Sequence, residues 1–213
     1  MPSRYEREHL ETFRRVRAHL NRRSQEEREA LLRRIGPSLG VRAEVRAFQE
    51  ERFSGVCTAK CFRDGTSACC AREGIAAFFA DVVIDTLLST PDEIDLLEEV
   101  LSGSSEGPAC VYLGPSGCLW RLKPIACEMF LCDHARRSVL DADEAAASLW
   151  ESLRAQERQF TWPDRPVLFD ELEARFMEEG LNSPLMYCHR SPGLLRVKAR
   201  AGLGSGIRSA GAS

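Results

Sequence analysis

Residues 110–132 read CVYLGPSGCLWRLKPIACEMFLC and contain four of the nine cysteines in this chain of 213 residues: Cys110, Cys118, Cys127 and Cys132. Turn-forming residues at 114–117 join two apolar flanks, a pattern that predicts a β-hairpin with Cys110 and Cys118 facing each other. Proline restricts the backbone that leads to Cys127. The stretch therefore presents thiols from a hairpin and from the turn that follows it.

A second group of cysteines precedes this stretch and comprises Cys57, Cys61, Cys69 and Cys70. Cys57 and Cys61 share a face if a helix extends to both of them, because they are one helical turn apart. Cys69 and Cys70 point to opposite faces of an extended backbone, so they more easily serve two centres, or two irons of one cluster, than a single ion. The eight thiols could form one site or two.

Clustered thiols in a reducing compartment predict metal binding rather than disulfides. The N-terminus has no apolar signal segment, and no apolar run of about 18 residues could span a bilayer, so we expect a cytoplasmic protein. Cytosolic thiols stay reduced, and soft anionic thiolates bind zinc and iron–sulfur clusters. The expected cofactor is Zn²⁺ or an iron–sulfur cluster. Its expected ligands are drawn from Cys57, Cys61, Cys69, Cys70, Cys110, Cys118, Cys127 and Cys132.

Four further residues outside the two cysteine groups are of types that bind metals. Cys188 lies apart from the eight clustered cysteines and precedes His189, and it fits a buried structural role and a ligand role equally. His9 and His19 lie on a strongly charged helical pattern, so we expect both to face solvent.

Helical patterns fill most of the remaining chain. We expect helices over residues 5–23, 24–36, 41–53, 90–101, 141–159 and 166–179. Ser24 and Glu27 form a capping box at the start of the second of these, and Gly36-Pro37 is expected to end it. The fold class is therefore mainly α with a small β-hairpin, in which helices surround an irregular cysteine-rich centre organised by metal.

Two segments are expected to lie in the core. Residues 75–88, IAAFFADVVIDTLL, are apolar apart from a few residues that include Asp81 and Asp85, and they fit either a strand or a buried helix. The residues expected to face inward from the helix over 141–159 are Leu149, Trp150 and Leu153.

The chain is expected to divide into four parts. These are a helical N-terminal region (1–54), a cysteine-cluster metal-binding domain (55–134), C-terminal helices that pack on the core (135–197) and a disordered tail (198–213). The tail is rich in Gly, Ala and Ser and cannot bury enough apolar surface to order itself. A formal charge of -3 gives no reason to expect a nucleic-acid partner, and the sequence leaves any protein partner open.

An ordered series of short motifs runs from the first cysteine group to the second. The motifs are Cys57, Cys61, Cys69-Cys70, the helix start Thr90-Pro91-Asp92-Glu93-Ile94, Cys110-Val-Tyr112-Leu, Gly117-Cys118-Leu-Trp120, Lys123-Pro124-Ile-Ala-Cys127 and Phe130. In this order they resemble the bacterial YkgJ-type cysteine-cluster proteins, described as zinc- or iron-chelating. The resemblance implies a mostly helical protein around a metal-organised centre. The spacing from Cys61 to the adjacent pair is longer than usual, and Lys123 stands where the family usually has Arg.

The cysteine-containing residues are compatible with three alternative functions. The first is a structural or storage-type metal site closed by four thiolates. The second is an iron–sulfur enzyme or electron carrier, which related cysteine clusters in flagellin lysine N-methylases suggest; Glu128, Asp133 and His134 would be its nearby proton-transfer candidates, and His134 could also replace a thiolate. The third is a zinc-stabilised hairpin that presents Arg and aromatic residues to nucleic acid or protein.

Overall fold

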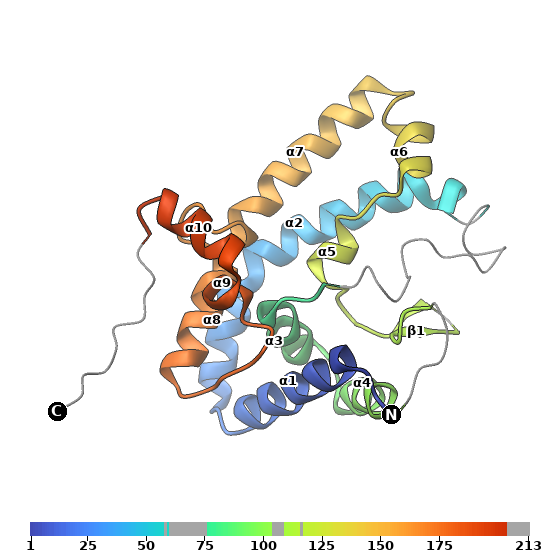
Figure 1. Ribbon diagram of the computed structural model, residues 1–213. Helices are drawn as coiled ribbons and strands as arrows, with labels where there is room; N and C mark the ends of the chain where they lie inside the picture. The colour runs from blue at the N-terminus through green and yellow to red at the C-terminus, as the bar shows by residue number, and fades with distance from the viewer. Residues whose placement is uncertain (58, 60–75, 104–108, 116, 204–213) are drawn as a thin grey trace.

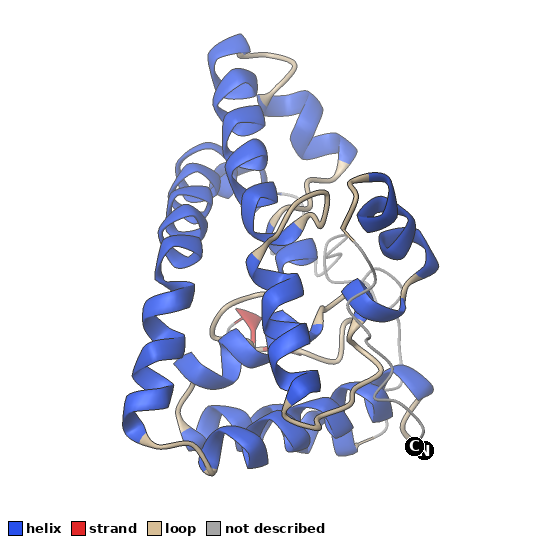
Figure 2. Cartoon of the chain, turned by 90° about the vertical axis from the view of Figure 1, so that its left-hand side faces the viewer, coloured by secondary structure: helices blue, strands red, loops and turns tan. Residues whose placement is uncertain are grey.

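The computed structural model describes the chain apart from residues 58, 60–75, 104–108, 116 and 204–213. The described residues form ten helices and one hairpin, so the fold is mainly α with a small β-hairpin, as the sequence predicted (Figure 2). The helices are α1 (Arg4–Asn21), α2 (Gln25–Cys57), α3 (Phe79–Leu88), α4 (Pro91–Ser102), α5 (Ile125–Glu128), α6 (Asp133–Val139), α7 (Glu144–Thr161), α8 (Leu168–Glu178), α9 (Tyr187–Arg190) and α10 (Pro192–Arg200), and the strands are β1 (Leu113–Gly114) and β2 (Gly117–Cys118).

The long helix α2 runs beside α7 and continues without a break through Pro37 (Figure 1). The expected end at Gly36-Pro37 is therefore wrong, and the two helices expected over 24–36 and 41–53 are one. Proline costs about 3 kcal/mol in a helix interior. Buried side chains recur at helical spacing on both sides of it, at Leu31, Ile35 and Val45, and their packing outweighs that cost. The helix also crosses the boundary expected at residue 54.

The apolar stretch before residue 88 forms the helix α3 at the centre of the fold (Figure 1). Every residue from Phe79 to Leu87 is buried, and α1, α2 and α8 pack around the helix. The sequence allowed either a strand or a buried helix here, and the structure shows the buried helix. The next helix, α4, begins with a capping box in which Thr90 and Glu93 exchange hydrogen bonds, as its sequence indicates.

The hairpin is present but shorter than the sequence suggested. β1 and β2 are antiparallel, with Leu113 opposite Cys118 and Gly114 opposite Gly117. Cys118 therefore pairs with Leu113, and the expected pairing with Cys110 is wrong. The cause is a turn before β1, where the Leu113 amide donates to the Cys110 carbonyl at 3.0 Å. Gly117 has a φ of 121°, which residues with a side chain rarely adopt.

The core has a main cluster around α1, α3 and α8 and a second cluster between α2, α6 and α7. In the second cluster the rings of Phe48 and Trp150 are stacked with centroids 5.8 Å apart, and Leu153 is buried beside them. Leu149 is 47% exposed, so the expectation that it faces the core is wrong. Consecutive helix residues point about 100° apart, and Trp150 takes the inward direction.

The last described helix, α10, includes residues 198–200, which were expected to belong to the tail. Lys198 is only 3% exposed, and its ammonium lies 2.6 Å from the Asp170 carboxylate on α8. Most of the expected tail, residues 204–213, lies outside the described residues. Among the helices that the structure describes, none is long and apolar enough to cross a membrane.

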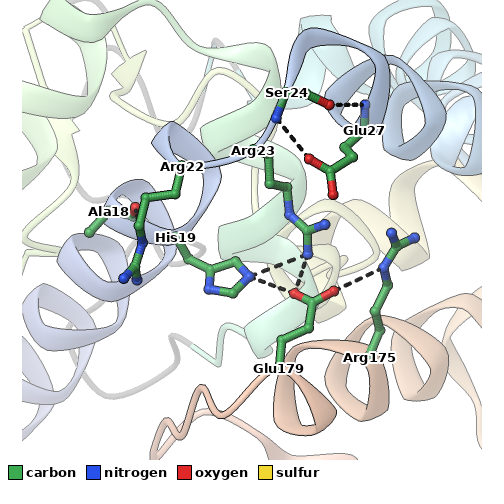
Figure 3. Close-up of polar contacts among 8 residues, drawn as sticks. All are labelled: Ala18, His19, Arg22, Arg23, Ser24, Glu27, Arg175 and Glu179. Atoms are coloured by element: carbon green, nitrogen blue, oxygen red, sulfur yellow. Dashed lines mark hydrogen bonds and ion pairs between the residues drawn. The ribbon is translucent and has the colours of Figure 1, made fainter.

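The two histidines of α1 do not face solvent as expected. His9 is 1% exposed and bonds to Tyr112. His19 is partly buried, and its Nε2 lies 2.5 Å from a carboxylate oxygen of Glu179, at the end of α8. Figure 3 shows Glu179 held between His19, Arg23 and Arg175. Tyr112 and Glu179, the partners of His9 and His19, come from distant parts of the chain, so the pattern of α1 alone could not indicate them.

Candidate metal centre

Three of the predicted ligands, Cys110, Cys118 and Cys127, come from separate short elements. Cys110 precedes β1, Cys118 ends β2 and Cys127 lies in α5. All three are partly buried. Cys110 and Cys118 pack against the main core, and the amide of Leu119 donates to the Tyr112 carbonyl at 2.9 Å, which holds the hairpin backbone.

Two tyrosines connect these three cysteines in space. The charges of Cys110 and Cys127 act on the Tyr5 phenol, whose pKa is raised first by burial and then by these thiols. Burial also raises the pKa of Tyr112, with further contributions that include Cys110 and Cys118. Cys110 and Cys127 thus lie close enough to influence Tyr5, and Cys110 and Cys118 close enough to influence Tyr112, although these cysteines are up to 17 positions apart in the printed sequence.

A buried histidine supports the tyrosine pair. The Nδ1 atom of His9 lies 2.7 Å from the Tyr112 hydroxyl, and the His9 ring lies 3.9 Å from the Tyr5 ring, centroid to centroid. Burial lowers the pKa of His9 to about 3, so its ring is neutral at pH 7. We name Tyr5, His9 and Tyr112 the tyrosine–histidine group.

Carboxylates on the central helix hold the backbone that carries Cys127. Asp81 accepts a hydrogen bond from the Ile125 amide, and Asp85 accepts one from the Leu122 amide, both at 2.9 Å. Burial raises the pKa of Asp81 to about 6 and that of Asp85 to about 7. The sequence showed these acids inside an apolar stretch, but it could not show that they bind residues 122–125.

Arg42 of α2 completes this support. Its Nε donates to the Glu128 carboxylate at 2.5 Å, another of its nitrogens donates to the Lys123 carbonyl, and a third lies 3.6 Å from Asp81. The guanidinium is 2% exposed. Arg42 was not among the predicted site residues, although its helical spacing from Ile35 and Ser38 on the buried face of α2 was an available signal.

Cys57 and Cys132 lie in a different environment from these three. Both pack against the second core cluster, between α2, α6 and α7. Cys57 is the last residue of α2, and Cys132 is the N-cap of α6, where its sulfur accepts a hydrogen bond from the Ala135 amide at 3.4 Å. The described cysteines are thus divided, because Cys110 and Cys118 pack on the main cluster whereas Cys57 and Cys132 pack on the second.

The remaining predicted ligands, Cys61, Cys69 and Cys70, lie outside the described residues. Within the described residues, no group of three or more Cys, His, Asp or Glu side chains is positioned to hold a metal ion. His134 is partly buried in the first turn of α6, and Asp133 beside it is exposed. Glu128 is bound to Arg42, so its carboxylate is already occupied by a cation.

Cys188 belongs to a separate buried group. The C-terminal charged cluster consists of Asp170, Glu173, His189 and Lys198, from α8, α9 and α10. Glu173 accepts hydrogen bonds from the backbone amide and the Nδ1 atom of His189, at 3.2 and 3.1 Å. Burial, and then the charges of Glu173 and Asp170, raise the pKa of the Cys188 thiol. A thiol held neutral in this way is a poor metal ligand.

A cavity of about 380 Å³ lies at the corner between α1, α2 and α8. Its lining includes Arg22, Arg23 and Glu27, and Figure 3 shows Glu27 exchanging hydrogen bonds with the Ser24 backbone and hydroxyl. Glu179 also lines the cavity and pairs with Arg23. The charges of the cavity are thus partly neutralised within the chain, and none of the described cysteines lines it.

No family model matches this chain, and neither a curated protein nor a solved structure matches it. The resemblance to cysteine-cluster proteins therefore stays a prediction from the motifs. The donor chemistry of the described residues fits a thiolate centre in part, because partly buried thiols from separate elements lie close enough to two tyrosines to influence the pKa of their phenols.

Proposed function

We propose that the protein binds zinc or an iron–sulfur cluster through cysteine thiolates from residues 57–132. The observation that carries the proposal is that Cys110 and Cys118 pack on the core cluster that contains Tyr5 and Tyr112, and that Cys127, from a third element, lies close enough to act on the pKa of the Tyr5 phenol. Thiolates repel one another, and a bound cation offsets that repulsion. The missing donors would come from Cys61, Cys69 and Cys70, with Cys57 and Cys132 as further candidates.

The surroundings of Cys127 support this proposal. The backbone from Leu122 to Ile125 is bound at three points by Asp81, Asp85 and Arg42, all of which are buried. Metal sites need ligands that are held in place by their outer neighbours. The two-residue strands β1 and β2 and the four-residue helix α5 are too short to hold this backbone by themselves.

A reducing compartment, the cytoplasm, is part of the proposal, because it would keep the thiols available to metal. The partner is the metal ion or cluster itself. Neither a membrane nor a nucleic acid is part of this function.

The test is the metal content, the acid-labile sulfide content and the ultraviolet–visible spectrum of the protein purified without oxygen. Iron with sulfide and broad visible absorption would identify an iron–sulfur cluster and favour an electron carrier or enzyme. Stoichiometric zinc without colour would identify a structural site. Protein that contains neither metal, and that takes up neither after its thiols are reduced, would contradict the proposal.

A further inference from the structure

The cavity between α1, α2 and α8 is lined by several basic side chains and lies outside the predicted metal centre. Arg22 and Arg23 lie in the connection between α1 and α2, and His19 lies in the last turn of α1. Together with Glu27 and Glu179, these residues line a volume of about 380 Å³. Sites for small molecules commonly enclose about 300–1,000 Å³, so the cavity has room for a small ligand.

The Glu179 carboxylate shows which ligand chemistry this corner can hold. One of its oxygens lies 2.5 Å from the Nε2 atom of His19 and also accepts a hydrogen bond from the Nη2 atom of Arg23. Its other oxygen lies 3.4 Å from the Nε atom of Arg175 (Figure 3). The basic side chains of the corner therefore already hold an oxyanion, which the protein itself supplies.

Glu179 uses only part of the Arg23 guanidinium. The Arg23 side chain is 6% exposed, and its Cζ atom lies 5.1 Å from the centroid of the Phe176 ring, a contact that restrains the guanidinium. Nε and Nη2 lie on the same edge of a guanidinium, and oxyanions commonly bind both. Glu179 accepts from Nη2, whereas the buried Nε has no hydrogen-bond partner among the described residues. Because an unpaired buried donor is costly, this edge favours an anion that binds both nitrogens.

The charges around the cavity favour an anion with more than one negative charge. Three guanidinium groups, two in the lining and that of Arg175 beside it, lie here with only two carboxylates. The Glu27 carboxylate is already bound to the Ser24 amide at 2.8 Å. A free carboxylate would compete poorly with Glu179, which is tethered to the chain. Phosphate carries more charge and more oxygens, so it can bind the arginines and the histidine together.

We propose that this cavity binds a phosphate group, either as the free ion or as part of a small phosphate ester. The phosphate takes the place of the Glu179 carboxylate on His19 and on the Nε–Nη2 edge of Arg23, and Arg22 is a further donor. Glu179 occupies these donors when phosphate is absent and so acts as an internal competitor. The site shares no residue with the predicted metal centre and does not depend on it.

The experiment titrates the full chain with inorganic phosphate and with acetate by isothermal titration calorimetry at constant ionic strength. The wild-type protein should bind phosphate in a saturable manner and should not bind acetate at the same concentrations. The absence of saturable phosphate binding, or acetate binding of equal strength, would overturn the proposal. Glycerol 3-phosphate then distinguishes the two sources, because binding at least as tight as that of phosphate identifies an ester and weaker binding identifies the free ion.

A pair of variants that keep the net charge tests the guanidinium edge. Arg23→Lys removes the Nε–Nη2 edge and should weaken phosphate binding by about tenfold, the usual loss of a charged hydrogen bond. Arg34→Lys is the matched control, because Arg34 also joins α2 to a glutamate of α8, with its Nε atom 2.9 Å from Glu171, but does not line the cavity. Arg34→Lys should bind phosphate as the wild type does. Unchanged binding in Arg23→Lys would overturn the proposed contact.

A second pair of variants tests the internal competitor. Glu179→Gln should bind phosphate about fivefold more tightly than the wild type, because it frees the basic side chains from an ion pair. Glu171→Gln removes the same charge from the exposed partner of Arg34 and should leave phosphate binding unchanged. An equal gain in both variants would show that net charge alone is responsible and would overturn the site. If Arg23→Lys loses helical circular dichroism, this second pair decides by itself.

Discussion

The cysteine-bearing segment, residues 110–132, and the C-terminal charged cluster both place cysteine near histidine and carboxylates, but in opposite surroundings. In the segment the thiols are partly buried, and the carboxylates of Asp81 and Asp85 are bound to backbone amides. In the cluster, Cys188 is fully buried and lies near carboxylates that raise its pKa. The comparison shows that residue type alone does not define a ligand, because burial and charge decide whether a thiolate can form.

The largest combined effect on stability and metal content is expected from Arg42→Ala. The change leaves Glu128 and Asp81 buried without their cation, and breaking a buried ion pair from one side costs about 3–5 kcal/mol. Because Arg42 also binds the Lys123 carbonyl, metal content should fall as well. Urea unfolding and metal analysis measure the two effects. A variant with lower stability but full metal content would contradict the role of Arg42 in holding the cysteine-bearing segment for metal binding.

The second effect is a dependence of stability on pH that arises from Asp85. Its pKa is raised to about 7 in the folded protein, against about 3.9 for an unperturbed aspartate, so the folded state holds more protons between these values. Stability should therefore fall as the pH rises from about 4 to 7, by at most about 1.4 kcal/mol per unit. Asp85→Asn keeps an oxygen for the Leu122 amide and should reduce this slope in urea unfolding series. An identical slope in both proteins would show that other groups cause it.

A smaller effect is expected in the C-terminal charged cluster. Glu173→Ala leaves the His189 amide and ring without their acceptor and should cost about 1–3 kcal/mol. Metal content should not change, since no predicted ligand lies in this cluster. Glu173→Gln, which keeps an acceptor, is the control and should cost less. Metal loss in Glu173→Ala at temperatures where the protein stays folded would contradict the separation of the two regions.

The smallest effect is expected at an exposed position of α7, which serves as a reference for the other variants. Leu149→Ala changes a side chain that is 47% exposed and should alter stability by no more than about 0.5 kcal/mol. Trp150→Ala, one residue further along, removes a buried ring that is stacked on Phe48 and should cost about 3–5 kcal/mol. Thermal unfolding measures both. Equal losses would mean that the inward face of α7 is assigned incorrectly.

Sequence reasoning succeeded where local chemistry determines the structure. The capping boxes at Ser24 and Thr90, the hairpin turn and most helices follow from residues close together in the chain. It failed where distant residues decide. Pro37 lies inside a helix because of packing along the whole of α2, and His9 is buried because Tyr112 binds it from the hairpin.

The candidate site shows the same limit. The cysteines were visible as a cluster in the sequence, and Asp81 and Asp85 were visible as acids in an apolar stretch. Their relation was not visible, because no local pattern shows that α3 binds the backbone before Cys127. Tyr5 was the least predictable, since it lies 105 positions before Cys110 on a different element.

The most direct test of a thiolate centre in the cysteine-bearing segment compares Cys127→Ser with Cys188→Ser, each purified without oxygen and analysed for bound metal per chain. The account predicts that Cys127→Ser loses most of its metal and that Cys188→Ser keeps the wild-type amount, because only the first removes a predicted ligand. Equal metal loss in the two variants, or full retention in Cys127→Ser, would contradict it.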